Sequence, residues 1–169
     1  MGPVVKTISA SISRLSTVEA GSLYEQHVLN VLTKYGFTLK SCGGPNDKGV
    51  DLFGHLLQVP VIVQCKQYQA QPLTPSVLRE LYGVIAARPG HFGLLVCCGG
   101  VKAGSLSFLQ SANLPLGVMT LLTQDESSQP TSLTLNQAAR RALPFLRQTC
   151  VYYRDGNGLD VKVIDLHIT

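Results

Sequence analysis

Two apolar runs, residues 50–57 and 59–68, most constrain how this chain can fold. Both are short and rich in aliphatic residues, as is typical of strands, and only a brief link around Gln58 and Pro60 separates them. A loop of glycines and polar residues, 43–49, precedes the first run. The pattern predicts a loop followed by two strands that pair as a hairpin.

Polar residues lie at the end of this predicted hairpin that is opposite its connecting link. Residues two apart on a strand share a face, so Gln64 and Lys66 should point together, while Cys65 points the other way. Asp51, at the mouth of the first run, would then lie close to them. A carboxylate, an amide oxygen and an ammonium in one place could hold a divalent metal and a phosphate.

Composition indicates a globular protein with one core. The 169 residues are 45% hydrophobic and 14% charged, which is too apolar for a disordered chain. The longest apolar run, Phe92–Cys98, is far below the roughly 20 residues that a membrane helix needs, so we expect a soluble protein. The net charge of +4 is compatible with a polyanionic partner but does not identify one.

The rest of the chain alternates between helical and strand patterns. We predict helices at 23–35, 75–87, 105–112 and 133–146, strands at 37–40, 92–98 and 116–122, and a final hairpin of 150–153 and 159–168. In the first helix Leu23 would belong to the apolar face that packs on the core, and Ser22 and Glu25 would form a capping box. Gly83 would mark a close packing contact in the second helix. The fold class is therefore α/β, with a mixed sheet flanked by helices.

The cysteines and the N-terminal segment bear on location. Five cysteines without a Cys-x-x-Cys pattern make a zinc site improbable and favour an intracellular, reducing compartment. Before the first acid, Glu19, the chain carries Lys6, Arg14 and many hydroxyl residues, a composition loosely like a mitochondrial presequence. A flexible arm is the alternative, and the mitochondrial matrix and the nucleus are both compatible locations.

The order of these pieces resembles the PD-(D/E)xK nuclease superfamily. Asp51 precedes a Gln64-Cys65-Lys66 triplet, and Glu25 lies on the first helix. The closer resemblance is to the Mrr-like branch of type IV restriction endonucleases, in which glutamine replaces the usual acid of the triplet. The similarity extends over roughly residues 22–122. It implies a restriction-endonuclease-like αβββαβ core, here with a C-terminal helix and β-hairpin added.

That resemblance implies a metal-dependent DNA endonuclease that hydrolyses phosphodiester bonds. Asp51, the Gln64 amide oxygen and the Cys65 main-chain carbonyl would ligate Mg²⁺ or Mn²⁺. Lys66 would position or help deprotonate the attacking water and offset charge on the phosphate. Glu25 would bind a metal through water or orient Lys66. Because glutamine is neutral, the site should bind metal weakly until DNA phosphate is present.

Each of these residues also has an ordinary structural explanation. Asp51 could cap a turn, Lys66 could be a solvated edge residue, and Glu25 could serve only the capping box. Secondary candidates are Asp47 as a ligand, His55 on the predicted Asp51 face, and Gln67 and Tyr68 near the substrate backbone. The alternative function is a catalytically weak or inactive DNA-binding module that retains the nuclease fold.

We divide the chain into an N-terminal arm or presequence-like segment (1–20), a nuclease core (21–123) and a C-terminal extension (124–169) on the same domain. Cutting both DNA strands needs two active sites, so a homodimer is expected. The extension is a candidate for dimer contacts or for gripping DNA.

Overall fold

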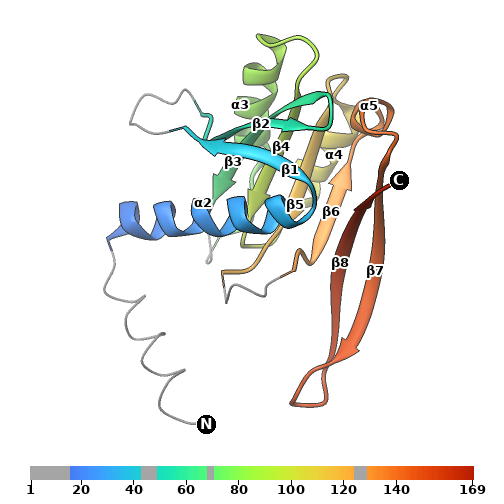
Figure 1. Cartoon of the computed structure of the whole chain (residues 1–169). Helices are drawn as coiled ribbons and strands as arrows, with labels where there is room; N and C mark the ends of the chain where they lie inside the picture. Colours follow the sequence, from blue (N-terminus) through green and yellow to red (C-terminus); the bar gives the residue numbers. More distant parts are fainter. Residues whose placement is uncertain (1–15, 43–48, 68–70, 124–128) are drawn as a thin grey trace.

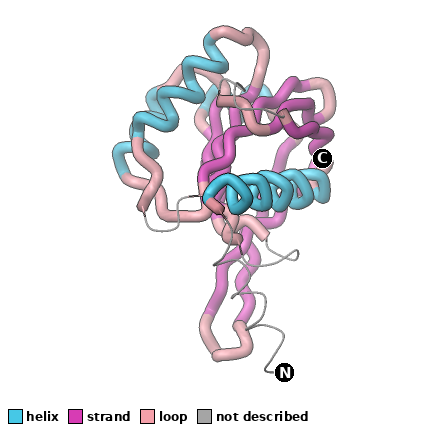
Figure 2. Tube along the Cα trace, turned by 90° about the vertical axis from the view of Figure 1, so that its left-hand side faces the viewer, coloured by secondary structure: helices cyan, strands magenta, loops and turns pink. Residues whose placement is uncertain are grey.

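A six-stranded mixed sheet with helices on both faces forms the body of the protein (Figures 1 and 2). The computed structural model describes residues 16–42, 49–67, 71–123 and 129–169. Its elements are α2 (Thr17–Lys34), β1 (Phe37–Ser41), β2 (Leu52–Leu56), β3 (Val59–Lys66), α3 (Pro75–Ala86), β4 (Phe92–Cys97), α4 (Ala103–Ser111), β5 (Leu116–Thr120), β6 (Ser132–Leu135), α5 (Gln137–Ala142), β7 (Leu146–Arg154) and β8 (Asp160–Ile168).

The strands follow chain order across the sheet, from β1 to β6. The first three strands form an antiparallel meander, β3, β4 and β5 run parallel, and β6 returns antiparallel to β5. The two apolar runs thus form the predicted β2–β3 hairpin, and the α/β class with a mixed sheet is confirmed. Parallel pairing places the carboxyl ends of β3, β4 and β5 at one edge, where α/β proteins commonly bind ligands.

Two hydrophobic clusters cover the two faces of the sheet. One packs α2 against alternate strand residues such as Val61, Val63 and Leu94, and it also includes Leu146 and Leu166 of the C-terminal ribbon. The other packs α3 and α4 against the opposite strand residues. A strand buried on both faces loses the apolar–polar alternation of a surface strand, as all six buried residues of β4 show.

Helix α2 begins earlier than predicted and buries a different set of side chains. Its capping box joins Ser16 and Glu19, with the Glu19 N–H donating to Ser16 Oγ over 3.2 Å and the Ser16 N–H donating to Glu19 Oε2 over 2.9 Å. The capping box predicted at Ser22 and Glu25 is therefore wrong, because both residues lie inside the helix. Leu23, predicted to face the core, is 57% exposed, while its neighbour Tyr24 is buried.

The earlier start of α2 also concerns the predicted N-terminal arm. The helix begins at Thr17, so residues 17–20 form its first turn. Residues 1–15 lie outside the described part of the chain. The division of the chain into three segments stays a prediction.

The helix predicted at 133–146 is wrong and is replaced by strand β6 and the short helix α5. Leu133 and Leu135 alternate with half-buried residues, which suits pairing with β5. Asn136 then caps α5 and is completely buried. Its Oδ1 accepts from the N–H groups of Leu116 and Ala139, and its Nδ2 donates to the carbonyl of Leu114 over 2.7 Å. Pairing with β5, which lies elsewhere in the sequence, therefore determines that residues 132–135 form a strand.

The remaining elements agree with their patterns. Helix α3 buries Val77, Leu78, Leu81 and Ile85, and the final hairpin forms as β7 and β8 around a turn at 155–159. Within the described residues, no helix is long and apolar enough to span a membrane.

Two glycines provide a test of this packing. Gly54 lies in the middle of β2 without interrupting the ladder, and an added Cβ would overlap the Thr38 carbonyl of β1. An added Cβ at Gly83 would meet no atom within 4 Å, so the close contact predicted there is wrong.

We therefore expect Gly54→Ala to lower the free energy of unfolding by about 1–3 kcal/mol through overpacking. The matched variant Gly83→Ala should raise it by about 0.5–1 kcal/mol, because alanine suits a helix interior better than glycine. Urea unfolding of both variants measures these changes. An equal response at the two positions would contradict this packing.

Candidate active site

Asp51, one residue before β2, is held by hydrogen bonds on both sides of its backbone. Its N–H donates to the carbonyl of Val63 over 3.0 Å, and its carbonyl accepts from the N–H of Cys42 over 2.8 Å. These bonds extend the pairing of β2 with β3 and β1 by one residue. The backbone of Asp51 is therefore fixed between Val63 and Cys42, which limits where its side chain can lie.

The Asp51 carboxylate makes the hydrogen bond that follows the last backbone hydrogen bond between β2 and β3. Its Oδ2 accepts from the N–H of Cys65 over 2.7 Å, in the place where a further β2 carbonyl would otherwise bond to β3. In a strand, the N–H and C=O of one residue point to the same side. The Cys65 carbonyl therefore also points toward the Asp51 side of β3, whereas the Lys66 carbonyl points to β4 and accepts from Cys98.

Glu25 reaches this region because α2 is docked on the carboxyl edge of the parallel strands. The buried Tyr24 hydroxyl donates to the carbonyl of Leu121 over 2.9 Å, and His27 Nε2 lies 3.2 Å from the carbonyl of Leu122. Both contacts lie just beyond β5, which ends at Thr120. They hold the part of α2 that carries Glu25.

The Cys65 thiol lies in an environment shaped by burial and by nearby charged side chains. Burial, followed by the nearby Asp51 and Glu25 carboxylates, raises the pKa of the Cys65 thiol well above its usual range, and the Lys66 ammonium opposes this shift. The thiol is thus protonated near neutral pH and is a poor metal ligand, because thiolate is the ligating form. Only the Cys65 carbonyl remains a plausible ligand from this residue.

Gln64 lies on the opposite face of β3 from Cys65. The Cys65 side chain packs against the cluster beneath α2, whereas Gln64 lines a cavity of about 650 Å³ beside α3, together with Gly49, Glu80 and Arg88. Gln64 is 3% exposed, and its Oε1 has no hydrogen-bond partner among the described residues. A buried carbonyl oxygen without a partner is costly, so this atom is suited to receiving a donor or a cation.

The oxygen atoms of Asp51, Gln64 and Cys65 fit the requirements of a divalent metal. No group of three or more His, Cys, Asp or Glu side chains could hold a metal within the described ranges. Asp51, the unpartnered Gln64 Oε1 and the outward Cys65 carbonyl offer only oxygen, as Mg²⁺ prefers. Mg²⁺ commonly keeps water and substrate phosphates alongside one or two carboxylates, and these residues fit that mode of binding.

The secondary candidates fall outside this cluster or outside the described chain. His55 pairs with Thr38 and Pro60 near the far end of the hairpin, four residues from Asp51, and it is exposed. Gln67 follows β3 and is half-buried. Asp47 and Tyr68 lie outside the described residues.

Sequence reasoning missed Tyr24, which anchors α2 beside the site. The spacing Tyr24, Val28 and Val31 is a helical apolar face and could have identified it in place of Leu23. The hydrogen bond from its hydroxyl joins residues 97 positions apart, so no local signal could have revealed that contact.

Comparison with known proteins identifies the family. The Mrr_cat family model, which describes a restriction endonuclease, matches residues 19–126. The chain belongs to this family. The match confirms the resemblance seen in the motif, and it covers the helix of Glu25, the β2–β3 hairpin and the parallel strands.

An uncharacterised protein of the fission yeast Schizosaccharomyces pombe, named as mitochondrial, is 32% identical over 148 residues. The aligned region covers 83% of this chain, which spans about 60% of the length of that relative. No solved structure matches the chain.

Proposed function

We propose that this chain is a Mg²⁺- or Mn²⁺-dependent DNA endonuclease that uses Asp51, Gln64, Lys66 and Glu25. The observation that carries the proposal is that the carboxylate of Asp51 and the charges of Glu25 and Lys66 all act on one residue, Cys65. Asp51 bonds to the Cys65 N–H over 2.7 Å, and Glu25 and Lys66 act on the same residue through their charges. Membership of a nuclease family supports phosphodiester hydrolysis as the reaction.

Three groups would hold the metal: the Asp51 carboxylate, Gln64 Oε1 and the Cys65 carbonyl. The bound cation would supply positive charge that polarises the scissile phosphate. Lys66 would orient the attacking water and stabilise negative charge on the phosphate oxygens. The water oxygen would bond to phosphorus as the bond to the leaving ester oxygen breaks, with the proton of the water passing to solvent and the leaving oxygen taking up a proton from solvent. Glu25 would keep the Lys66 ammonium in position.

The correction to α2 supports this role for Glu25. The capping box at the helix start uses Ser16 and Glu19, so Glu25 is not needed there. Glu25 instead lies half-buried where its charge acts on Cys65.

We expect Asp51→Ala and Lys66→Ala to reduce DNA cleavage by at least about 100-fold while the chain stays folded, because they remove a metal ligand and the group that orients water. Cleavage of supercoiled, linear, branched and methylated DNA should be compared with Mg²⁺, with Mn²⁺ and with EDTA. Lys162→Ala, an exposed lysine of β8, is the matched control and should cut normally.

Undiminished cleavage by either site variant would exclude this site. Salt-dependent DNA binding by the unaltered chain without cleavage under any metal would instead favour a DNA-binding module with the nuclease fold.

Gln64→Glu tests whether the residue contributes to metal binding. A carboxylate in place of the amide adds negative charge close to the cation, so Mn²⁺ affinity without DNA should rise by at least about tenfold. Gln64→Ala keeps the site neutral and should give no increase. Calorimetric titration of both folded variants provides the measurement, and identical affinities would show that Gln64 does not bind metal.

We further propose that the protein acts in mitochondria. The fission yeast relative carries that location in its name, and the segment before Glu19 is basic and rich in hydroxyl residues. The chain should be taken up by isolated mitochondria in a manner that depends on membrane potential. Replacing Lys6 and Arg14 by glutamine should weaken uptake, and uptake by neither form would contradict this location.

A further inference from the structure

The outer edge of β7 is nine residues long, and no other strand of the described part of the chain pairs with it. Figures 1 and 2 show the β7–β8 ribbon extending away from the body of the protein. Every β7 residue except Leu146 is exposed, including Val151 at 41%, Tyr152 at 67% and Tyr153 at 49%. The strand contains no proline or glycine, and its only charges are Arg147 and Arg154. Proteins normally protect such edges with charges, prolines, bulges or covering elements.

The hydrogen bonds at the two ends of the ribbon show which backbone groups face outward. Thr169 N–H donates to the Phe145 carbonyl, and Asp155 N–H donates to the Leu159 carbonyl. Bonded pairs alternate along an antiparallel ladder, so the odd-numbered residues of β7 bond to β8. The even-numbered residues direct their N–H and C=O away from β8.

One of these outward residues is already occupied. Leu146 N–H donates to the Leu143 carbonyl over 3.1 Å. The outward set without an assigned main-chain partner in the described structure is therefore Gln148, Cys150, Tyr152 and Arg154. These four residues are placed symmetrically about Val151.

We infer that β7 pairs with β7 of a second copy of this chain, with the two-fold axis at Val151. In that antiparallel register, Gln148 lies opposite Arg154 of the second copy, and Cys150 lies opposite its Tyr152. In this register the four outward residues of each strand all form main-chain hydrogen bonds with the outward residues of the other copy. If the register shifts by two residues, some of these outward residues have no opposite partner in β7 of the second copy. A symmetric interface of this kind forms a closed dimer.

The side chains are compatible with this register. Val151 meets its own copy at the axis, and Thr149 lies opposite Tyr153, which are favourable β-branched and aromatic pairs. The two arginines are never opposite one another, and Arg154 is already paired with Asp160 over 3.3 Å. Pairing would also cover the exposed Val151, Tyr152 and Tyr153 side chains.

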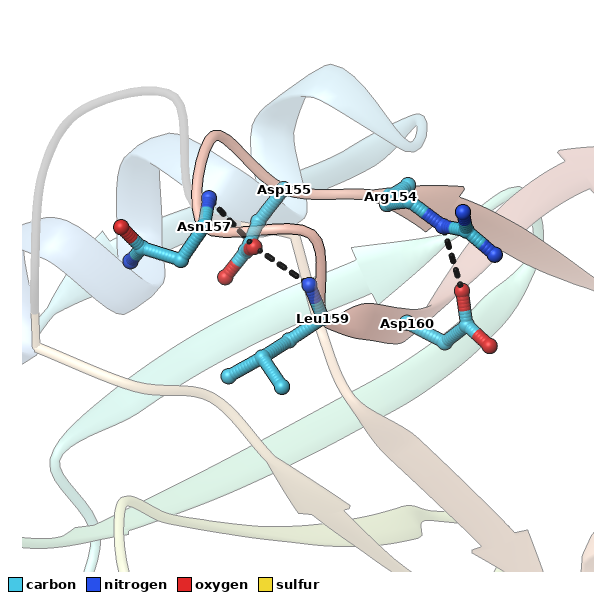
Figure 3. A network of polar contacts seen from close by, with 5 residues as sticks. All are labelled: Arg154, Asp155, Asn157, Leu159 and Asp160. Carbon is cyan, nitrogen blue, oxygen red and sulfur yellow. Dashed lines mark hydrogen bonds and ion pairs between the residues drawn. The ribbon is translucent and has the colours of Figure 1, made fainter.

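The ribbon is organised to present this edge as far as its tip. Figure 3 shows that Asp155 Oδ1 accepts from the N–H groups of Asn157 and Leu159, each over 2.9 Å. Gly158, at φ +78°, donates its N–H to the Asp155 carbonyl over 3.0 Å. These bonds close the turn tightly and keep β7 extended through Arg154.

Disulfide trapping tests both the pairing and its register. In a Cys150→Ser background, Val151→Cys should form an intermolecular disulfide under mild oxidation, because the two positions face each other with Cα atoms about 4.5 Å apart. Thr149→Cys is the matched control on the same face of β7. Its two copies would lie about 14 Å apart, too far for a disulfide. Mass spectrometry of the linked peptides identifies the residues joined.

Sedimentation gives an independent readout. The unaltered chain should sediment as a dimer, and Val151→Lys should convert it to a folded monomer because two lysines would face each other at the axis. Thr149→Lys, opposite a tyrosine, should remain dimeric. Trapping at position 149 instead of 151 in the Cys150→Ser background, or at Cys150 in the unaltered chain, would overturn this register. A chain that stays monomeric with and without DNA would overturn the pairing.

Discussion

The hydrogen bond from the Cys65 N–H to the Asp51 carboxylate is the interaction on which the candidate site depends. It is made where the β2–β3 ladder ends, so a side chain continues the hydrogen bonding that the backbone began. This keeps the two strands together at their open end without burying an unpaired N–H. The same bond directs a carboxylate, and the neighbouring Cys65 carbonyl, toward one edge of the sheet.

The rest of the fold supports that edge from both faces. Tyr24 fastens α2 to the segment after β5, which places Glu25 on the Cys65 face. Helix α3 covers the other face and walls the cavity that Gln64 lines. The site is thus built on strand ends and held by helices with buried apolar contacts, which favours a fixed geometry over a loop-based one.

The C-terminal ribbon, β7 and β8, is buried at its base and exposed along β7. Its base belongs to the main core through Leu146, Ile164 and Leu166, while β7 and the turn project into solvent. The anchoring gives the exposed edge a stable position relative to the nuclease core. A dimer formed through β7 would join two such cores, and two sites are what cleavage of both strands of a DNA duplex requires.

The sequence by itself determined the features that depend on local pattern and chemical type. The paired apolar runs specified the β2–β3 hairpin, and the order of Asp51, Gln64 and Lys66 indicated the family, because strand periodicity and ligand chemistry can be read from neighbouring residues. Only the tertiary structure decided what depends on distant contacts. Pairing with β5 turned residues 132–135 into a strand, and the hydroxyl bond to Leu121 selected Tyr24 over Leu23 as the buried residue. The helix begins at Thr17 with Ser16 as its N-cap, so Glu25 has no part in capping. Strand periodicity had already separated Gln64 from Cys65, but only the packing of the helices placed Cys65 beneath α2 and Gln64 beside α3.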